Sequence, residues 1–255
     1  LMEVMGISRL VVFTEPERLL SEAQVSAFWE LVERRAAGEP LQYLLGHCEF
    51  MGMSFQVGEG VLIPRGDTEV LVEEAIQYCK DFHYQVAVDI CTGSGCIPIC
   101  LSRFGYTEVY GTDISEKALS YARKNNASLH GNVTFYQGDL FEALPSAFKG
   151  NIDVITSNPP YIARAVIPTL MEEVRDFEPS LALDGGLDGL DFYRRIIAEA
   201  GQWLKAGGRL LLEIGYDQRQ AVSGLCEAAG LKEIVCKQDL SGLDRVITAR
   251  KALEE

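Results

Sequence analysis

The tetrapeptide Asn158-Pro159-Pro160-Tyr161 contains the residue types needed to hold a flat amino group. It follows the apolar run 152–157, which is typical of a buried strand. Consecutive prolines fix φ at two positions, remove two backbone N–H donors and keep the preceding residue out of the helical region. The pattern predicts a stiff turn that presents carbonyl oxygens, a carboxamide and an aromatic ring. Two oxygens can accept the hydrogens of an –NH2 group while the ring covers its face; the alternative is a rigid turn without chemistry.

A glycine-containing segment at 89–95, Asp-Ile-Cys-Thr-Gly-Ser-Gly, is typical of the loop between a strand and the following helix. Glycines let the backbone turn tightly and approach a ligand closely. The dinucleotide-binding pattern Gly-x-Gly-x-x-Gly would require a glycine at position 98, where Pro98 stands, so a pyrophosphate site is disfavoured. The acid Asp89 also fits poorly with phosphate and favours a cationic ligand.

Two further acids follow the next two predicted strands. Asp113 ends one of them, where a carboxylate typically accepts hydrogen bonds from ribose hydroxyls, and Asp139 is placed to accept from an adenine amino group. Each acid alone is explained equally well as a solvated loop residue or a helix cap, but together they indicate one groove. A ligand with an adenosine, a positive charge and no phosphate is S-adenosylmethionine. The predicted cofactor residues are Asp89, Cys91, Thr92, Gly93, Ser94, Gly95, Asp113, Asp139, Leu140 and Asn158.

Charge lowers the expectation of a nucleic-acid substrate. The 255 residues include 23 basic and 37 acidic ones, for a net charge of −14, and no basic run exceeds two residues. Proteins that grip a nucleic-acid backbone usually carry a basic face. No apolar run reaches the roughly 18 residues of a membrane span, and the first residues lack the basic start of a signal peptide. We therefore expect a cytoplasmic protein without membrane contact, and a monomer.

The seven cysteines show no convincing metal-binding pattern. None forms Cys-x2-Cys, and only Cys96 and Cys100 have a spacing that would place two thiols on one helix face. The three histidines lie elsewhere in the chain and supply no second half of a zinc site. We expect reduced thiols and no metal.

From residue 86 the pattern alternates between strands and helices, which predicts a mostly parallel sheet covered on both faces. The expected strands are 86–91, 108–112, 133–137, 152–157, 208–214, 231–237 and 245–250. The expected helices follow the first strand up to residue 104 and span 115–129, 190–204 and 217–229. The last two strands have no helix between them, so one of them is expected to run antiparallel. Before residue 86 the pattern predicts a helix at 16–37, a β-hairpin within 43–63 and a helix at 67–80.

Five segments, in this order, resemble the HemK family. They are RRAAGEPLQYLLG (34–46), LIPRGDTE (62–69), NPPY (158–161), FEPSLALDGG (177–186) and LLEIG (211–215). The resemblance implies an α/β fold: a seven-strand class I methyltransferase, Rossmann-like, with the last strand antiparallel. It also implies an N-terminal helical substrate-docking region (1–42), a linking β-hairpin (43–66) and a methyltransferase domain (67–255).

The same resemblance implies the reaction. The family transfers a methyl group from S-adenosylmethionine, leaving S-adenosylhomocysteine, to the side-chain nitrogen (N5) of the glutamine in the Gly-Gly-Gln motif of class I peptide chain release factors. The implied catalytic residues are Asn158, Pro159 and Tyr161, and the implied substrate site is Asn158, Pro159, Pro160 and Tyr161. In this mechanism the Asn158 side-chain oxygen and the Pro159 carbonyl each accept one amide N–H, and Tyr161 covers the amide.

Three features depart from the family pattern. Cys91 replaces the first glycine of the cofactor loop, Gly66 replaces a proline, and the N-terminal helical region is shorter than usual. A positive φ at Cys91 would add strain of about 1 kcal/mol or more.

Two other functions are weighed against this one. A nucleic-acid amino-methyltransferase acting on adenine N6 or guanine N2 would use the same turn, but it disagrees with the charge and with the flanking motifs. A non-catalytic protein that binds S-adenosylmethionine would have no need of an intact Asn158 and Tyr161. Arg65 is expected either to wall a substrate channel or to pair with Asp67 or Glu69, and Glu213 either to line the groove or to support it.

Overall fold

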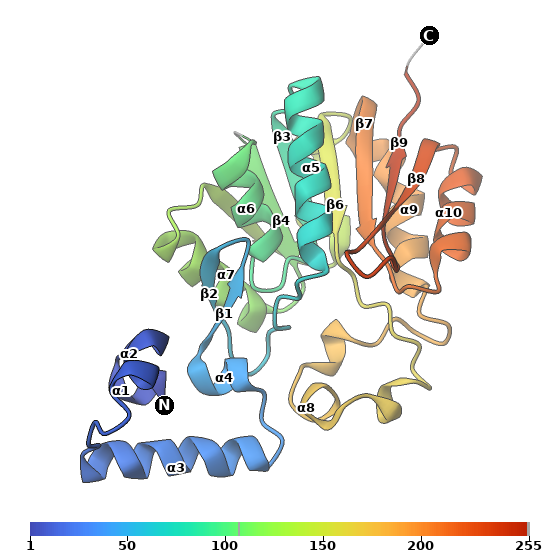
Figure 1. The fold of residues 1–255 in the computed structure, drawn as a ribbon. Coiled ribbons are helices and arrows are strands. Elements are labelled where there is room, and N and C mark those ends of the chain that lie inside the picture. Colours follow the sequence, from blue (N-terminus) through green and yellow to red (C-terminus); the bar gives the residue numbers. More distant parts are fainter. Residues whose placement is uncertain (107, 254–255) are drawn as a thin grey trace.

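The computed structural model describes residues 1–106 and 108–253, and its centre is a seven-stranded sheet (Figure 1). The order across the sheet is β5-β4-β3-β6-β7-β9-β8, and β9 runs antiparallel to both of its neighbours, as the sequence predicted. The strands are β3 (Val86–Ile90), β4 (Glu108–Asp113), β5 (Val133–Gln137), β6 (Ile152–Ser157), β7 (Leu204–Glu213), β8 (Lys232–Gln238) and β9 (Asp244–Arg250).

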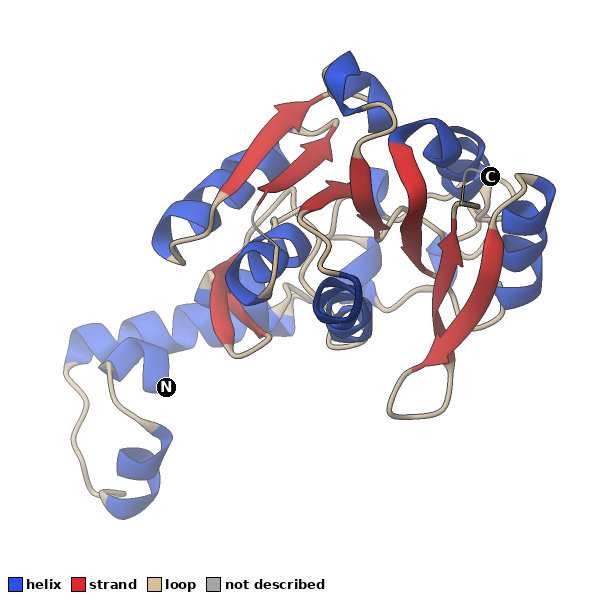
Figure 2. Ribbon diagram, turned by 90° about the horizontal axis from the view of Figure 1, so that it is seen from above, coloured by secondary structure: helices blue, strands red, loops and turns tan. Residues whose placement is uncertain are grey.

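Helices cover both faces of this sheet, as Figures 1 and 2 show. One apolar layer joins the sheet to α5 (Thr68–Phe82) and α6 (Cys96–Phe104), and α7 (Glu116–Ser128) packs beside α6. The other joins it to α9 (Asp191–Trp203) and α10 (Arg219–Ala228). Because neighbouring side chains of a strand point to opposite faces, Ala87 belongs to the first layer and Val88 to the second.

The register of the strands places their carboxyl ends in one row. Ile90 of β3 lies opposite Thr112 of β4 and, on its other side, opposite Ser157 of β6. The chain moves outward from β3 to β4 and β5 and then crosses back to β6, so the strand order reverses beside β3. Ligands of open α/β sheets bind outside the carboxyl ends of the strands at such a reversal. The loop after β3, the end of β4 and the turn after β6 are therefore neighbours.

The N-terminal helices lie to one side of the sheet (Figures 1 and 2). They are α1 (Met2–Met5), α2 (Arg9–Thr14), α3 (Glu22–Ala36) and α4 (Leu41–Leu45). The predicted helix 16–37 begins only at Glu22, because Ser21 and Gln24 form a capping box and Pro16 lies in the preceding turn. No residue between 1 and 39 is buried.

A β-hairpin links these helices to the sheet. It consists of β1 (His47–Phe50) and β2 (Met53–Gln56). The predicted hairpin region starts at residue 43, but residues 43–45 are the end of α4. Phe50 and Phe55 of the hairpin are fully buried in the layer beneath α5. The Asn125 side chain in α7 exchanges two hydrogen bonds with the backbone of Gln56, at 2.7 and 3.0 Å, which fixes the hairpin to the domain.

The short helices of the segment between β6 and α9 are η3 (Ile167–Thr169), α8 (Glu172–Arg175) and η4 (Ser180–Ala182), and two 3-10 turns, η1 (Leu140–Ala143) and η2 (Ser146–Phe148), follow β5. None of the described helices has the length and apolar character needed to cross a bilayer.

Candidate active site

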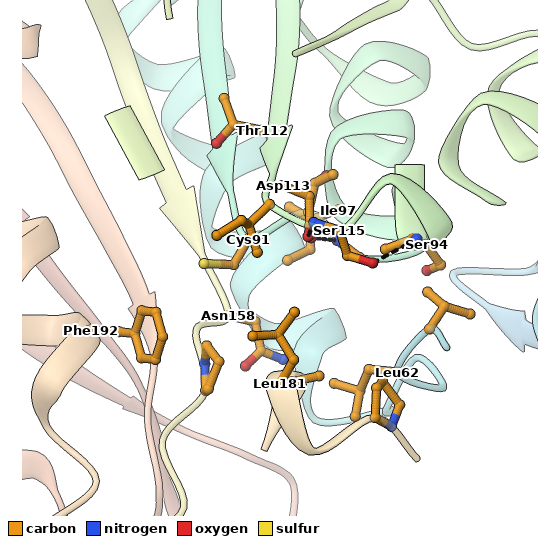
Figure 3. A pocket seen from close by; sticks show the side chains of 18 of the residues that line it. Leu62, Cys91, Ser94, Ile97, Thr112, Asp113, Ser115, Asn158, Leu181 and Phe192 are labelled. Carbon is orange, nitrogen blue, oxygen red and sulfur yellow. Dashed lines mark hydrogen bonds between the residues drawn. The ribbon is translucent and has the colours of Figure 1, made fainter. Parts of the chain in front are cut away.

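A cavity lies at the carboxyl ends of β3, β4 and β6 (Figure 3). Its walls come from the loop after β3, the residues after β4 and β5, the turn after β6 and the segment 179–182. Figure 3 shows Cys91, Asp113 and Asn158 arranged around this space. Eight of the ten predicted cofactor residues line it: Cys91, Thr92, Gly93, Ser94, Asp113, Asp139, Leu140 and Asn158.

Asp113 connects two walls of the cavity. Its Oδ2 accepts a hydrogen bond from the Gly93 backbone N–H at 2.8 Å, and its Oδ1 accepts one from the Ser115 N–H at 2.8 Å. Burial raises the pKa of Asp113, while the backbone N–H groups of Ser115, Gly93 and Ile114 lower it. A carboxylate offers about four acceptor positions, so Asp113 keeps room to accept a hydroxyl group of a ligand in the cavity.

Asp139 and Leu140 form the edge of the cavity after β5. Asp139 accepts a hydrogen bond from Arg195 Nη2 at 2.7 Å, and both side chains are partly exposed. This ion pair holds the carboxylate beside the opening. Leu140 is buried and has a φ of 49°, an unusual conformation for a leucine.

The remaining two predicted cofactor residues lie outside the lining. Asp89 is fully buried within β3, where Oδ1 accepts a hydrogen bond from Thr156 Oγ1 at 2.7 Å, and burial raises its pKa to about 7. Its Oδ2 has no hydrogen-bond partner among the described residues. Gly95 has a φ of 79°, and a Cβ there would approach Ala122 and Ile99 to 3.1 Å, so this glycine is required for the turn into α6.

Cys91 occupies the first glycine position of the loop with a φ of 62°. A non-glycine residue in this region is strained by about 1–2 kcal/mol. The positive φ that the sequence analysis named as the cause of strain at Cys91 is therefore present. Cys91 and Leu140 are thus two strained residues that line one cavity. Strain of this kind clusters at functional sites.

The strain at Cys91 gives a stability prediction. Cys91→Gly is expected to have a free energy of unfolding about 1 kcal/mol higher than Cys91→Ala, because both variants lose the thiol but only alanine keeps the left-handed strain. Chemical denaturation of the two variants without ligand measures this difference. A Cys91→Ala protein as stable as Cys91→Gly would show that the loop relaxes to a negative φ.

The Asn158-Pro159-Pro160-Tyr161 turn contributes two residues to the lining, Asn158 and Pro160. Pro159 is buried and lies outside the lining. Tyr161 packs against the apolar layer under α9 and α10, and its hydroxyl donates to Glu213 Oε1 at 3.3 Å. The role of Tyr161 as a cover for the substrate amide therefore stays a prediction.

Several lining residues were not predicted as site residues. Of the two alternatives for Arg65, the structure places it in the cavity lining, and its ion pair is with the buried Glu178 and not with Asp67 or Glu69. Glu178 also accepts a hydrogen bond from the Ile63 N–H at 3.2 Å, which joins the segment after the hairpin to the segment after β6. Only the motif segments 62–69 and 177–186 in the sequence indicated these residues.

Thr68, the first residue of α5, was not among the predicted site residues. Its hydroxyl oxygen accepts a hydrogen bond from Asn158 Nδ2 at 3.3 Å, and the residue lines the cavity. The N-cap of α5 is Asp67, which makes no side-chain cap and instead pairs with Arg245 at 3.2 Å.

Comparisons with known proteins show which family the chain resembles. Residues 1–46 match the family described as the PrmC N-terminal domain, and residues 84–242 match a methyltransferase domain. A release factor glutamine methyltransferase of Geobacter sulfurreducens is 42% identical over 96% of this chain and 85% of its own length. The corresponding protein of Clostridium botulinum is 40% identical over 98% of this chain and 89% of its own.

A solved structure shares the fold at low sequence identity. A methyltransferase from Pyrococcus furiosus is 16% identical, with a TM-score of 0.56 over 91% of this chain and all of that one, which supports the fold alone. The sequence relatives are far more similar and span nearly the whole chain. On this evidence the chain belongs to the release factor glutamine methyltransferase family.

Proposed function

We propose that this protein transfers a methyl group from S-adenosylmethionine to the side-chain nitrogen (N5) of the glutamine in the Gly-Gly-Gln motif of peptide chain release factors. The observation that carries the proposal is that Asn158 and Pro160 line the same cavity as Asp113 and the glycine loop. An amide held by the turn would therefore meet a ligand held by the loop. We propose a monomer that acts in the cytoplasm.

The cavity residues fit S-adenosylmethionine. Asp113 keeps acceptor positions for the ribose hydroxyls, and Asp139 and Leu140 are placed to border the adenine. The apolar side chains of Ile97 and Phe192, which also line the cavity, suit a flat aromatic base. When bound, this cofactor supplies a methyl group on a positively charged sulfur, an electrophile strong enough to react without a metal or a strong base.

The chain's own contribution is positioning and electrostatics. An amide nitrogen is a poor nucleophile because its lone pair is delocalised into the carbonyl. Acceptance of its two hydrogens by Asn158 Oδ1 and the Pro159 carbonyl would fix the nitrogen and stabilise the positive charge that develops on it. The prolines make this acceptor pair rigid, since their φ angles are fixed. The Arg65–Glu178 ion pair joins the segment after the hairpin to residues 179–182, which form one wall of the cavity.

The test is mass spectrometry of a release factor after incubation with the protein and S-adenosylmethionine. The expected product is a tryptic peptide with one added methyl on the glutamine of Gly-Gly-Gln, absent when that glutamine is replaced by alanine. A parallel incubation with labelled cofactor and total RNA tests the nucleic-acid alternative. Label in the RNA and none in the release factor would contradict the proposal.

A further inference from the structure

Two buried polar residues, Thr68 and Glu213, contact the proline turn. Thr68 is the first residue of α5 and is 2% exposed, and Glu213 is the last residue of β7 and is 1% exposed. The Thr68 hydroxyl oxygen accepts the hydrogen bond from Asn158 Nδ2, and the Tyr161 hydroxyl donates to Glu213 Oε1. Both flanking residues of the prolines are therefore held from behind by this pair.

The protonation state of Glu213 sets the direction of the hydrogen bonds from Glu213 through Thr68 to Asn158. Glu213 Oε2 is buried and makes no hydrogen bond of ordinary geometry with the described residues. Burial raises the pKa of Glu213 to about 7; the Thr68 hydroxyl and then Arg245 oppose this by favouring the ionised form. An ionised carboxylate only accepts hydrogen bonds, so the Thr68 hydroxyl beside it favours this form only as a donor. Its lone pairs are then left for the Asn158 Nδ2 donor.

This order decides which way the Asn158 carboxamide faces. With Nδ2 directed at Thr68, the Oδ1 atom points the other way, and no described residue donates a hydrogen bond to Oδ1. Asn158 lies at the edge of the cavity (Figure 3). We propose that Thr68 is a positioning residue that accepts the Asn158 Nδ2 hydrogen bond and so holds Asn158 with its oxygen toward the substrate amide. The identity of the substrate amide rests on the proposed function, whereas the orientation of Asn158 does not depend on it.

The same order predicts a dependence on pH. A protonated Glu213 becomes a donor to Thr68, whose hydroxyl can then donate to Asn158 Oδ1 and turn the Asn158 NH2 group toward the cavity. That group would repel the hydrogens of the substrate amide. Because the raised pKa of Glu213 is about 7, kcat is expected to increase as the pH rises through about 7 and to be lower at more acidic pH. The titratable and polar groups that act electrostatically on Glu213 are Thr68, Tyr161, Arg245, Asp67, Tyr193 and Cys96.

The kinetic test compares Thr68→Val, which keeps the shape but removes the hydroxyl, with Thr68→Ser, which keeps the hydroxyl. For methylation of a release factor we expect kcat to fall about tenfold or more in Thr68→Val and to stay within about threefold in Thr68→Ser. The affinity for S-adenosylmethionine should change much less than kcat, because the proposed ribose and adenine contacts involve other residues. The rise of kcat near pH 7 should be lost in Glu213→Gln, which separates it from the titration of Asp89. Equal kcat in Thr68→Val and wild type would overturn the proposal.

A second measurement needs no substrate. In protein labelled with ¹⁵N, the Asn158 side-chain NH2 signals are expected to be protected from hydrogen exchange at pH 8 in wild type and Thr68→Ser and to lose that protection in Thr68→Val. Protection that persists in Thr68→Val would overturn the proposed orientation. If wild type fails to methylate a release factor while this protection depends on Thr68, the proposed function fails and the positioning role stands. Thermal unfolding of each variant shows whether it is folded.

Discussion

Replacing Asn158 with alanine is expected to lower kcat for glutamine methylation by about 10²- to 10³-fold, the usual cost of removing one preorganised electrostatic contact. The side chain supplies one of the two oxygens proposed to hold the substrate nitrogen. Its loss leaves the amide free to rotate away and leaves the developing charge less stabilised. The affinity for S-adenosylmethionine should change by no more than about threefold, because the ribose and adenine contacts proposed here involve other residues. Steady-state kinetics with a release factor and calorimetry with the cofactor separate the two effects.

A matched control for this variant is Asn151→Ala, since Asn151 is an exposed loop asparagine outside the cavity lining. It should leave both kcat and cofactor affinity unchanged. Asn158→Ala with the kcat of wild type would show that the turn does not hold the substrate. A variant that loses cofactor affinity and kcat together would show that Asn158 serves mainly the cofactor, for which it was also predicted, and not the substrate amide.

The second large effect is expected at Asp113. Asp113→Ala should weaken the binding of S-adenosylmethionine by about 10- to 100-fold, because hydrogen bonds to a charged group contribute about 1.5–3 kcal/mol. The carboxylate lines the cavity and is already fixed by the N–H groups of Gly93 and Ser115, so it needs little reordering to accept ribose hydroxyls. Calorimetric titration with the cofactor measures the change directly.

Asp113→Ala also removes the hydrogen bond that ties the glycine loop to the end of β4. Asp113→Asn is therefore the companion variant, since it keeps an acceptor oxygen and the shape of the side chain. It should bind more tightly than Asp113→Ala and more weakly than wild type. A dissociation constant in Asp113→Ala equal to that of wild type would mean that the ribose lies elsewhere.

Local patterns predicted most of the fold. The strands of the large sheet and the longer helices have apolar residues at strand or helical spacing, so their types and order follow from nearby residues. The short helices α1, α2, α4 and α8 were not predicted. The antiparallel β9 follows from two strands with no helix between them. The ends of the elements were predicted less accurately. The apolar pattern predicted a helix from residue 16, but α3 begins at Glu22, because the capping box at Ser21 starts the helix after a turn.

The sequence by itself determined that a glycine loop, several acids and a proline-locked turn meet at the carboxyl ends of neighbouring strands, because strand order and direction place those ends together. Only the tertiary structure decided which side chains face the cavity. Asp89 is buried inside β3 beside Thr156, whereas Asp113 stands at the end of β4 and lines the cavity. The Arg65–Glu178 pair and the Thr68–Asn158 bond join residues 113 and 90 positions apart. Such partners depend on long-range packing, and no local spacing of residues specifies them.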